Sequence, residues 1–504
     1  MKKDHCSVLV STDPFETRVV VLKDDNLDRY FLEREVRGNV LGSIFSGRVV
    51  KVIPGIRAAF IDVGLERSAF LPATQVVSQE VLEAATPEEK KAENGRSHRK
   101  RRRGVGLIEK SIREGESITV QVINVPGREK GPKVTTYFSI PGHYLVFMPT
   151  VRGLGVSRKI KGPKERARLR KVGEMARKQT EGGFVIRSAA EGVREEDIMR
   201  EAKWLHRRWQ DAVAGGKRKK RPFLLLPELS LAERVLRDMS EEAVHEVIVN
   251  DAQTLQRLKQ YAENSGMKIA DKISLWAKDD DLFESLGVEE KIERTFARKV
   301  ALGSGGHIVI DHAEALTAID VNTGSFTENR DASQTVLTTN MEAVRQIAYQ
   351  LRLRCIGGLI ILDLIDMERE DHKEMVYREL VKEVRKDKAK VSVRKISDMG
   401  LIEMTREHYG PRVIEMLQER CWYCDGTGNI LGRDTISGKM IRSVIRALQE
   451  KPKDLLVTAH QSMVLRMENE FSSYVRNLEK DYQVKIIFEA RIDVHIEYFK
   501  ISYM

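Results

Sequence analysis

The stretch LTAIDVNTGSF, residues 316–326, is an apolar run typical of a buried strand, yet it contains an acidic residue, Asp320, followed closely by Asn322. A carboxylate at the end of a buried strand loses its hydration unless a cation meets it. A second run, CIGGLIILDLIDME at residues 355–368, has a similar composition and ends with Asp363 and Asp366. Both runs are predicted to be buried parallel strands.

The segment between the two runs predicts how they are connected. Residues 333–354, SQTVLTTNMEAVRQIAYQLRLR, repeat apolar side chains at three- and four-residue spacing, which is typical of a helix. Strand, helix and strand form a βαβ unit, whose parallel strands end at the same edge of the sheet. Asp320 and Asp363 are therefore expected to lie together at the carboxyl edge, where open α/β sheets bind their ligands.

Two carboxylates with no histidine nearby in the sequence suit a hard divalent cation. Mg²⁺ is typically held by one or two carboxylates, with waters and substrate phosphates completing its coordination. Such an ion activates water and stabilises a phosphodiester under attack. Asn322 is placed to hydrogen-bond a carboxylate or a metal-bound water. The alternative is that the carboxylates cap helices or turns, and a helix cap is the preferred interpretation of Asp366.

Length and composition indicate several domains and a polyanionic partner. The chain has 504 residues, more than a single hydrophobic core usually supports. Lys and Arg outnumber Asp and Glu by 86 to 75, a net charge of +11 that is compatible with nucleic acid. The sequence shows no secretory signal and no apolar run of about 18 residues, so a cytoplasmic protein without a membrane span is expected.

Residues 38–138 contain short strands separated by Gly and Pro, which predicts a small barrel. In RAAFIDVGLERSAFLP, residues 57–72, Phe60 and Phe70 are interleaved with basic residues, as in barrels that stack unpaired bases and follow phosphates. The alternative is that both rings belong to the core. A charged insert at residues 86–106 interrupts the barrel, and an RNA-binding loop is preferred there to a nuclear-type signal or a solvated face.

The motif CWYCDGTG, residues 421–428, places Cys421 and Cys424 at the spacing of a zinc half-site. Structural zinc takes four ligands, and the sequence contains no second Cys-x-x-Cys. Two copies of the chain would complete the site, which predicts a homodimer with a shared Zn²⁺. A redox dithiol, or a site completed by His408 or Cys355, is the alternative, although the surroundings do not resemble a thioredoxin-like strand.

In GGFVIRSAAEG, residues 182–192, Arg187 and Ser188 follow a short apolar strand. An arginine offers a planar fork to a terminal phosphate, and a serine adds a hydroxyl donor. A surface arginine without a ligand is the alternative interpretation.

Five motifs, in order and spacing, resemble the ribonuclease E/G family of bacterial endoribonucleases. They are RAAFIDVGLERSAFLP (57–72), KGPKVTTYFSIPGHYLVFMP (130–149), ALTAIDVNTGSF (315–326), TNMEAVRQIAYQLRLRCIGGLIILDLIDM (339–367) and CWYCDGTG. The resemblance spans nearly the whole chain. Ending at residue 504, the chain is similar to the compact, ribonuclease G-like members, or to the catalytic half of the longer ones.

The resemblance implies a Mg²⁺-dependent endoribonuclease for single-stranded, A/U-rich RNA, acting in rRNA and mRNA processing and decay and leaving 5′-phosphate and 3′-hydroxyl ends. It implies that Asp320 and Asp363 bind Mg²⁺ with assistance from Asn322. The implied RNA contacts are Phe60, Phe70 and Lys130, with Arg128 as a further candidate. The implied sensor of a 5′-monophosphate end consists of Arg187, Ser188 in place of the family's threonine, and Val146. The family also shares zinc between two chains, as proposed for Cys421 and Cys424, and a tetramer is possible.

The implied fold class is a multidomain α/β protein with an inserted OB-type barrel and a zinc-link. Its expected parts are residues 1–37 and 231–295 (RNase H-like), 38–138 (the barrel), 139–230 (5′-phosphate sensor region), 296–417 (DNase-I-like catalytic domain), 418–431 (zinc-link) and 432–504 (small C-terminal domain). The competing class is a non-catalytic, zinc-linked RNA-binding scaffold, which the loss of Asp320 or Asp363 would have favoured. A small-molecule substrate is not expected.

Overall fold

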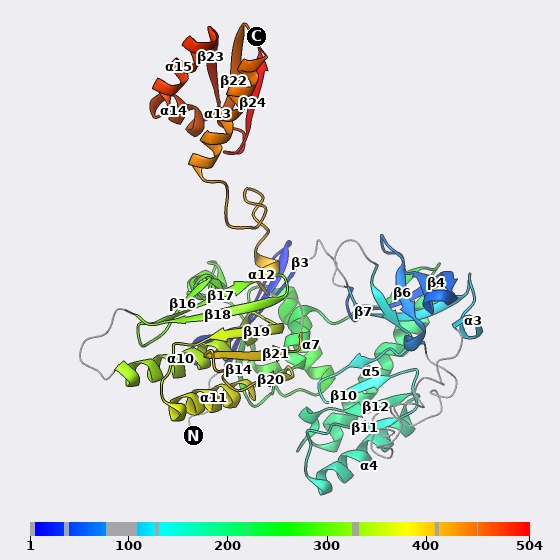
Figure 1. Cartoon of the computed structure of the whole chain (residues 1–504). Coiled ribbons are helices and arrows are strands. Elements are labelled where there is room, and N and C mark those ends of the chain that lie inside the picture. Colours follow the sequence, from blue (N-terminus) through cyan, green and yellow to red (C-terminus); the bar gives the residue numbers. More distant parts are fainter. Residues whose placement is uncertain are drawn as a thin grey trace. The chain divides into compact units, whose positions relative to one another are not determined.

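The computed structural model describes residues 6–34, 40–76, 108–125, 131–217, 219–324, 332–408, 413–450 and 452–504. The chain divides into two compact units, Met1–Ile414 and Glu415–Met504, and each is described by itself (Figure 1). Among the described residues, no helix combines the length and apolar character needed to cross a membrane.

A six-stranded sheet in the first unit carries the acidic pair. Its order is β16 (Lys299–Ala301), β17 (His307–His312), β18 (Leu316–Asn322), β19 (Gly358–Asp363), β21 (Leu401–Arg406) and β20 (Val391–Val393). Strands β18 and β19 are parallel, and α10 (Ala332–Leu353) connects them. The predicted βαβ unit is therefore confirmed.

In the described residues of the first unit, helices cover one face of this sheet and leave the other open. Helix α10 and α11 (Glu370–Val384) pack their apolar residues on it (Figure 1). Along β18 every second residue is buried, including Ile319 and Val321, whereas Asp320 is exposed. The prediction that both strands are fully buried is therefore wrong. Successive side chains of a strand point to opposite faces, so the acids lie on the open face and the apolar residues below the helices.

Two further sheets and a barrel complete the first unit. One sheet has the order β15 (Ile273–Leu275), β14 (Val244–Val249), β1 (Cys6–Thr12), β2 (Glu16–Lys23) and β3 (Asn26–Arg34). The barrel has the order β4 (Ile44–Ile53), β5 (Ala58–Asp62), β6 (Ala69–Pro72), β8 (Lys133–Thr135) and β7 (Ser117–Asn124). It is closed because β7 pairs back to β4, and β13 (Phe223–Leu226) adds to β4, so the predicted small barrel is confirmed.

The other sheet has the order β11 (Leu154–Val156), β12 (Gly183–Ile186), β10 (Leu145–Met148) and β9 (Ile140–Pro141). Helices α4 (Pro163–Gln179) and α5 (Glu195–Gly216) pack against its apolar core. The remaining helices are α3 (Ile108–Ser111), α6 (Leu231–Arg237), α7 (Ala252–Ser265), α8 (Leu282–Ser285), α9 (Val288–Phe296) and α12 (Val413–Leu417).

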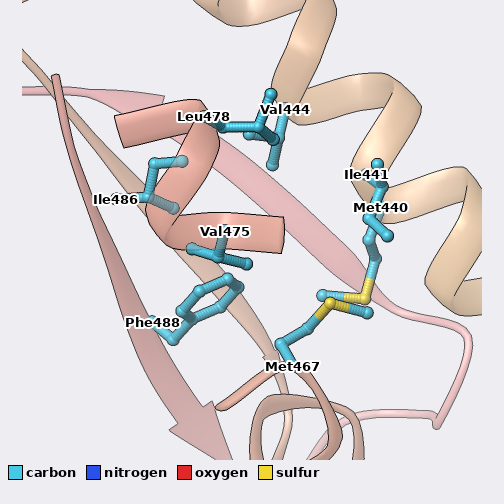
Figure 2. Close-up of a pocket in the computed structure, with 8 residues that line it drawn as sticks. All are labelled: Met440, Ile441, Val444, Met467, Val475, Leu478, Ile486 and Phe488. Atoms are coloured by element: carbon cyan, nitrogen blue, oxygen red, sulfur yellow. The ribbon is translucent and has the colours of Figure 1, made fainter. Parts of the chain in front are cut away.

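The second unit contains a three-stranded sheet in the order β23 (Lys485–Arg491), β22 (Asp454–His460) and β24 (Phe499–Tyr503). Its helices are α13 (Arg433–Gln449), α14 (Gln461–Asn469) and α15 (Ser472–Tyr482). Figure 2 shows Met440 and Met467 approaching each other in its core, and Val475 beside Phe488. The order of elements along the chain is α13, β22, α14, α15, β23 and β24.

The one-sided burial of β19 predicts a contrast between two leucines of that strand. Leu362 is fully buried, whereas Leu359 is 41% exposed. Leu362→Ala should lower the free energy of unfolding by about 2–5 kcal/mol, because it leaves a cavity under α10 and α11. Leu359→Ala should change it by about 0.5 kcal/mol or less. Urea unfolding of the full chain measures both, and equal losses would contradict the packing described.

Candidate active site

Backbone pairing brings the two carboxylates of the open face together. The parallel register pairs Leu316 with Leu359 and continues residue by residue until Asp320 lies opposite Asp363. Neighbouring strands run about 4.8 Å apart, so the two side chains project side by side. Asn322 lies on the same face and its Nδ2 donates to Asp320 Oδ2 at 2.7 Å. The three predicted residues therefore form one cluster.

The donor atoms of this cluster suit Mg²⁺. Both acids are exposed, and among the described residues no lysine, arginine or histidine forms an ion pair with either. No group of three His, Cys, Asp or Glu side chains capable of holding a metal gathers in the described part of the chain. Two carboxylates with an amide beside them, and space for waters and phosphate oxygens, match the hard oxygen coordination of Mg²⁺ rather than the nitrogen and sulfur ligands of zinc.

A histidine that sequence reasoning missed lies on the same face. His307 of β17 is directly opposite Asn322, and Val309 is opposite Asp320. Alternation places His307, Asn322 and Asp320 on one side of the sheet. The hairpin GGHIVIDHAEALTAIDV could have indicated this histidine, because its two strands pair antiparallel. His307 and Asp320 are 13 positions apart along the chain, so their proximity was not recognised.

Asp366 does not cap a helix, and that prediction is wrong. Helix α11 begins at Glu370, and its N-cap is Arg369, whose side chain makes no capping hydrogen bond. Asp366 instead lines a cavity of about 200 Å³ just beyond Asp363. The lining residues are Ile365, Asp366, Met367, Glu368, Lys373, Ile396, Asp398 and Gly400.

The two predicted stacking residues form a pair on the barrel. Phe60 of β5 and Phe70 of β6 are opposite each other, with ring centroids 5.9 Å apart in an edge-to-face arrangement. Both are half-buried and lie outside the apolar core of the barrel, so the core interpretation is wrong. Lys51 is opposite Phe60 on β4, and Lys133 is opposite Phe70 on β8. Lys133 was not predicted. Arg128, Lys130 and the insert 86–106 lie outside the described residues.

Val146 lies on β10 and Arg187 directly follows the neighbouring strand β12, but the Arg187 guanidinium already has partners. Its Nη1 donates to the Gly142 carbonyl at 2.5 Å and its Nη2 to Asp238 Oδ1 at 2.7 Å. Burial by itself would raise the pKa of the Asp238 carboxyl. Hydrogen bonds from Arg237 and Arg187 outweigh burial, so the pKa of Asp238 lies below its ordinary value. Ser188 is exposed, at the start of a short 3₁₀ turn. The structure thus adds Asp238, which the sequence did not indicate.

A buried carboxylate shapes the turn that binds Arg187. Glu201 of α5 is fully buried and accepts hydrogen bonds from the backbone N–H groups of His143, Tyr144 and Leu145, at 2.5–2.8 Å. Burial raises the pKa of Glu201 to about 7, although the three backbone hydrogen bonds act to lower that pKa. A Cβ atom on Gly142 would lie 2.6 Å from the Glu201 carboxylate, so the turn requires glycine at that position.

In the second unit, Cys421 and Cys424 lie in a tight turn that contacts the end of the chain. The Gly428 N–H donates to Cys424 Sγ at 3.2 Å and lowers the pKa of that thiol. His495 Nε2 contacts the Tyr423 carbonyl at 2.8 Å, which fixes the turn to the segment before β24. Trp422 is 86% exposed. Cys421 is exposed, Cys424 is partly exposed, and both thiols are free of a disulfide. Two thiols are half of the four ligands that a tetrahedral zinc site would need.

The local geometry of the cysteine turn bears on the redox alternative. A redox dithiol gains reactivity at a helix N-terminus, but α13 begins only at Arg433.

Comparisons with known proteins agree with this geometry. A model described as Ribonuclease E/G family matches residues 139–409, and one described as RNase E/G, Thioredoxin-like domain matches residues 420–504. The chain is 36% identical to Ribonuclease G of Escherichia coli (strain K12) over 492 residues, 97% of this chain and 96% of the relative. It is 32% identical to Ribonuclease G of Haemophilus influenzae over 499 residues, 98% of each.

Ribonuclease E of Escherichia coli (strain K12) is 31% identical over 472 residues, which cover 93% of this chain and 43% of that longer protein. The chain belongs to the ribonuclease E/G family, and the resemblance inferred from its five motifs is confirmed. The second model relates residues 420–504, which contain Cys421 and Cys424, to a thioredoxin-like domain. This match runs against the expectation that the surroundings of these cysteines do not resemble a thioredoxin-like structure.

Proposed function

We propose that the chain is a Mg²⁺-dependent endoribonuclease that cleaves single-stranded, A/U-rich RNA in the cytoplasm, in the processing and decay of rRNA and mRNA. The observation that carries this proposal is the register that places Asp320 opposite Asp363 on an open, water-accessible sheet face. Membership of the ribonuclease E/G family supports it. The products would carry 5′-phosphate and 3′-hydroxyl ends.

In the proposed mechanism, the chain contributes orientation and charge. Asp320 and Asp363 would hold the metal, which when bound supplies an activated water and charge stabilisation at the phosphate. The Asn322 amide keeps Asp320 Oδ2 in a fixed orientation through its 2.7 Å hydrogen bond. The open face leaves the carboxylates accessible to an extended RNA backbone, because no helix of the first unit covers that side of β18 and β19 in the described residues.

The barrel would bind the RNA strand away from the scissile bond. Phe60 and Phe70 offer half-exposed ring faces for unpaired bases, and Lys51 and Lys133 lie beside them for phosphates. Stacking with flanking cations recognises single strands with little sequence preference.

We further propose that Arg187, Ser188 and Val146 recognise a 5′-monophosphate end. A phosphate would compete with Asp238 for the Arg187 fork, since Asp238 Oδ1 occupies Nη2. Lys388 Nζ donates to the Asp238 carbonyl at 3.1 Å. Its ammonium lies close enough to Arg29, Arg187 and Lys159 to be repelled by their positive charges. This concentration of cations favours an anionic ligand.

Cys421 and Cys424 would bind a structural Zn²⁺ together with the same two residues of a second copy. Two thiolates per chain and a tetrahedral requirement of four ligands support a homodimer. Two such dimers could associate into a tetramer.

Replacing Asp363 by Asn should abolish cleavage while preserving RNA binding, because the amide keeps the shape but removes the charge that attracts the metal. Since even an outer-shell partner of a metal ligand contributes about 10–100-fold, the loss should exceed about 100-fold. Cleavage of a 5′-monophosphorylated A/U-rich oligomer in Mg²⁺ measures it. Binding without cleavage by the unaltered protein would instead favour the scaffold function.

Phe60→Ala should weaken binding of single-stranded RNA by about 1–3 kcal/mol, the value of one stacked base. Phe60→Tyr retains a ring face and is the matched control, for which near-normal affinity is expected. Fluorescence anisotropy with a labelled oligomer at fixed salt measures both variants. Equal affinity of the alanine and tyrosine variants would exclude stacking at this position.

Cys424→Ser, or removal of zinc by a chelator, should convert the dimer to a monomer, because each chain holds only half of the zinc site. About one zinc per two chains should be lost with the dimer. Light scattering and metal analysis measure mass and zinc content, with Cys355→Ser as the control that should change neither. A zinc-free dimer would contradict the shared site.

A further inference from the structure

Helix α10 contacts the backbone just beyond Asp363 through one buried side chain. Asn340 is fully buried, and its Nδ2 donates to the Ile365 carbonyl at 2.8 Å. The Ile365 N–H donates back to Asn340 Oδ1 at 3.1 Å. Ile365 lies two residues after Asp363, where β19 has ended. The Asn340 amide therefore fixes the backbone at Ile365. It hydrogen-bonds both the N–H and the carbonyl of that residue, as a neighbouring strand would.

A second side chain of the same helix acts on the other metal-binding strand. Glu342 Oε2 accepts a hydrogen bond from Ser304 N at 2.7 Å, in a turn closed by the bond from Leu302 N to Gly306 O at 2.9 Å. This turn lies directly against the end of β18, because a Cβ atom on Gly306 would be 2.6 Å from the Asn322 carbonyl oxygen. Through this turn, Glu342 supports the end of β18, which contains Asp320 and Asn322.

The positions of these residues on the helix explain how one element reaches both strand ends. Successive residues of an α-helix are separated by about 100°, so Asn340 and Glu342 point in nearly opposite directions. We propose that Asn340 and Glu342 are positioning residues that set the separation of the Asp320 and Asp363 carboxylates, and through it the affinity for Mg²⁺. This inference rests on the proposed function, since it takes both acids as metal ligands.

Such positioning matters because the two carboxylates repel each other and are open to water. Within the part of the chain that the structure describes, the bond between Asn322 and Asp320 is the one side-chain hydrogen bond that holds either carboxylate. Buried hydrogen bonds to the adjacent backbone, such as those of Asn340, are the means by which a metal site is preorganised.

The test compares Asn340→Asp and Glu342→Ala in the full chain. The aspartate keeps the shape of Asn340 but places an oxygen against the Ile365 carbonyl, and the alanine removes the acceptor for Ser304 N–H. Each should raise the MgCl₂ concentration for half-maximal cleavage by about 10–100-fold, with KM for RNA at saturating Mg²⁺ unchanged. The rise in melting temperature produced by a fixed MgCl₂ concentration should shrink in parallel.

Gln350→Leu is the matched control on the same helix, about 15 Å further along its axis. Gln350 is buried and its Oε1 accepts from Arg354 Nε at 2.6 Å, so the variant loses a buried hydrogen bond far from the strand ends. It should lower the melting temperature without moving the MgCl₂ midpoint.

An unchanged midpoint in both test variants, or an equal rise in Gln350→Leu, would overturn the inference. If Asn340→Asp does not fold, Glu342→Ala decides the outcome alone. Failure of the proposed function is distinguishable, because the unaltered protein would then show neither Mg²⁺-dependent cleavage nor Mg²⁺-dependent stabilisation.

Discussion

The parallel pairing of β18 and β19 is the constraint on which the candidate site depends. It brings Asp320 and Asp363, separated by 43 positions along the chain (363 − 320), to adjacent points of one sheet. A shift of one residue in this pairing would turn one carboxylate toward the helices, because the side-chain period of a strand is two. Ile319 and Leu362, buried beneath α10 and α11, oppose such a shift, since it would expose one of them.

Covering a sheet on one side only gives the same two strands opposite properties on their two faces. The covered face contains the apolar core shared with α10 and α11, and the open face holds acids, an amide and the His307 imidazole. The carboxylates of Asp320 and Asp363 therefore face water rather than the core. Stability and the candidate chemistry are thus supplied by different residues of the same short strands, which explains how an apolar run can contain a reactive acid.

Much of this arrangement could be predicted from the sequence. The periodicity of residues 333–354 and the two flanking apolar runs predicted the βαβ unit, and with it the pairing of the acids. The open face could not be predicted, because short apolar runs such as GLIILD look the same whether one or both faces are covered. The cap expected at Asp366 failed for a related reason, since a strand-end acid resembles an N-cap until the helix start is known.

The residues that the sequence did not indicate act through distant contacts. Asp238 accepts a hydrogen bond from the Arg187 guanidinium, 51 residues away along the chain. Glu201 accepts hydrogen bonds from a turn 56–58 residues away, and Asn340 hydrogen-bonds the backbone of Ile365. None belongs to a local pattern, because each hydrogen bond exists only after the sheets have assembled. Family resemblance identified the groups expected to touch RNA or metal, whereas the supporting contacts required the folded chain.

The most direct test of the metal site is anomalous diffraction from crystals of the protein soaked in Mn²⁺, a substitute for Mg²⁺ with the same preference for oxygen ligands. The geometry predicts one strong anomalous peak between the carboxylates of Asp320 and Asp363, within coordination distance of both. A peak elsewhere on the chain, with none between these two residues, would contradict the assignment of this sheet edge as the catalytic metal site.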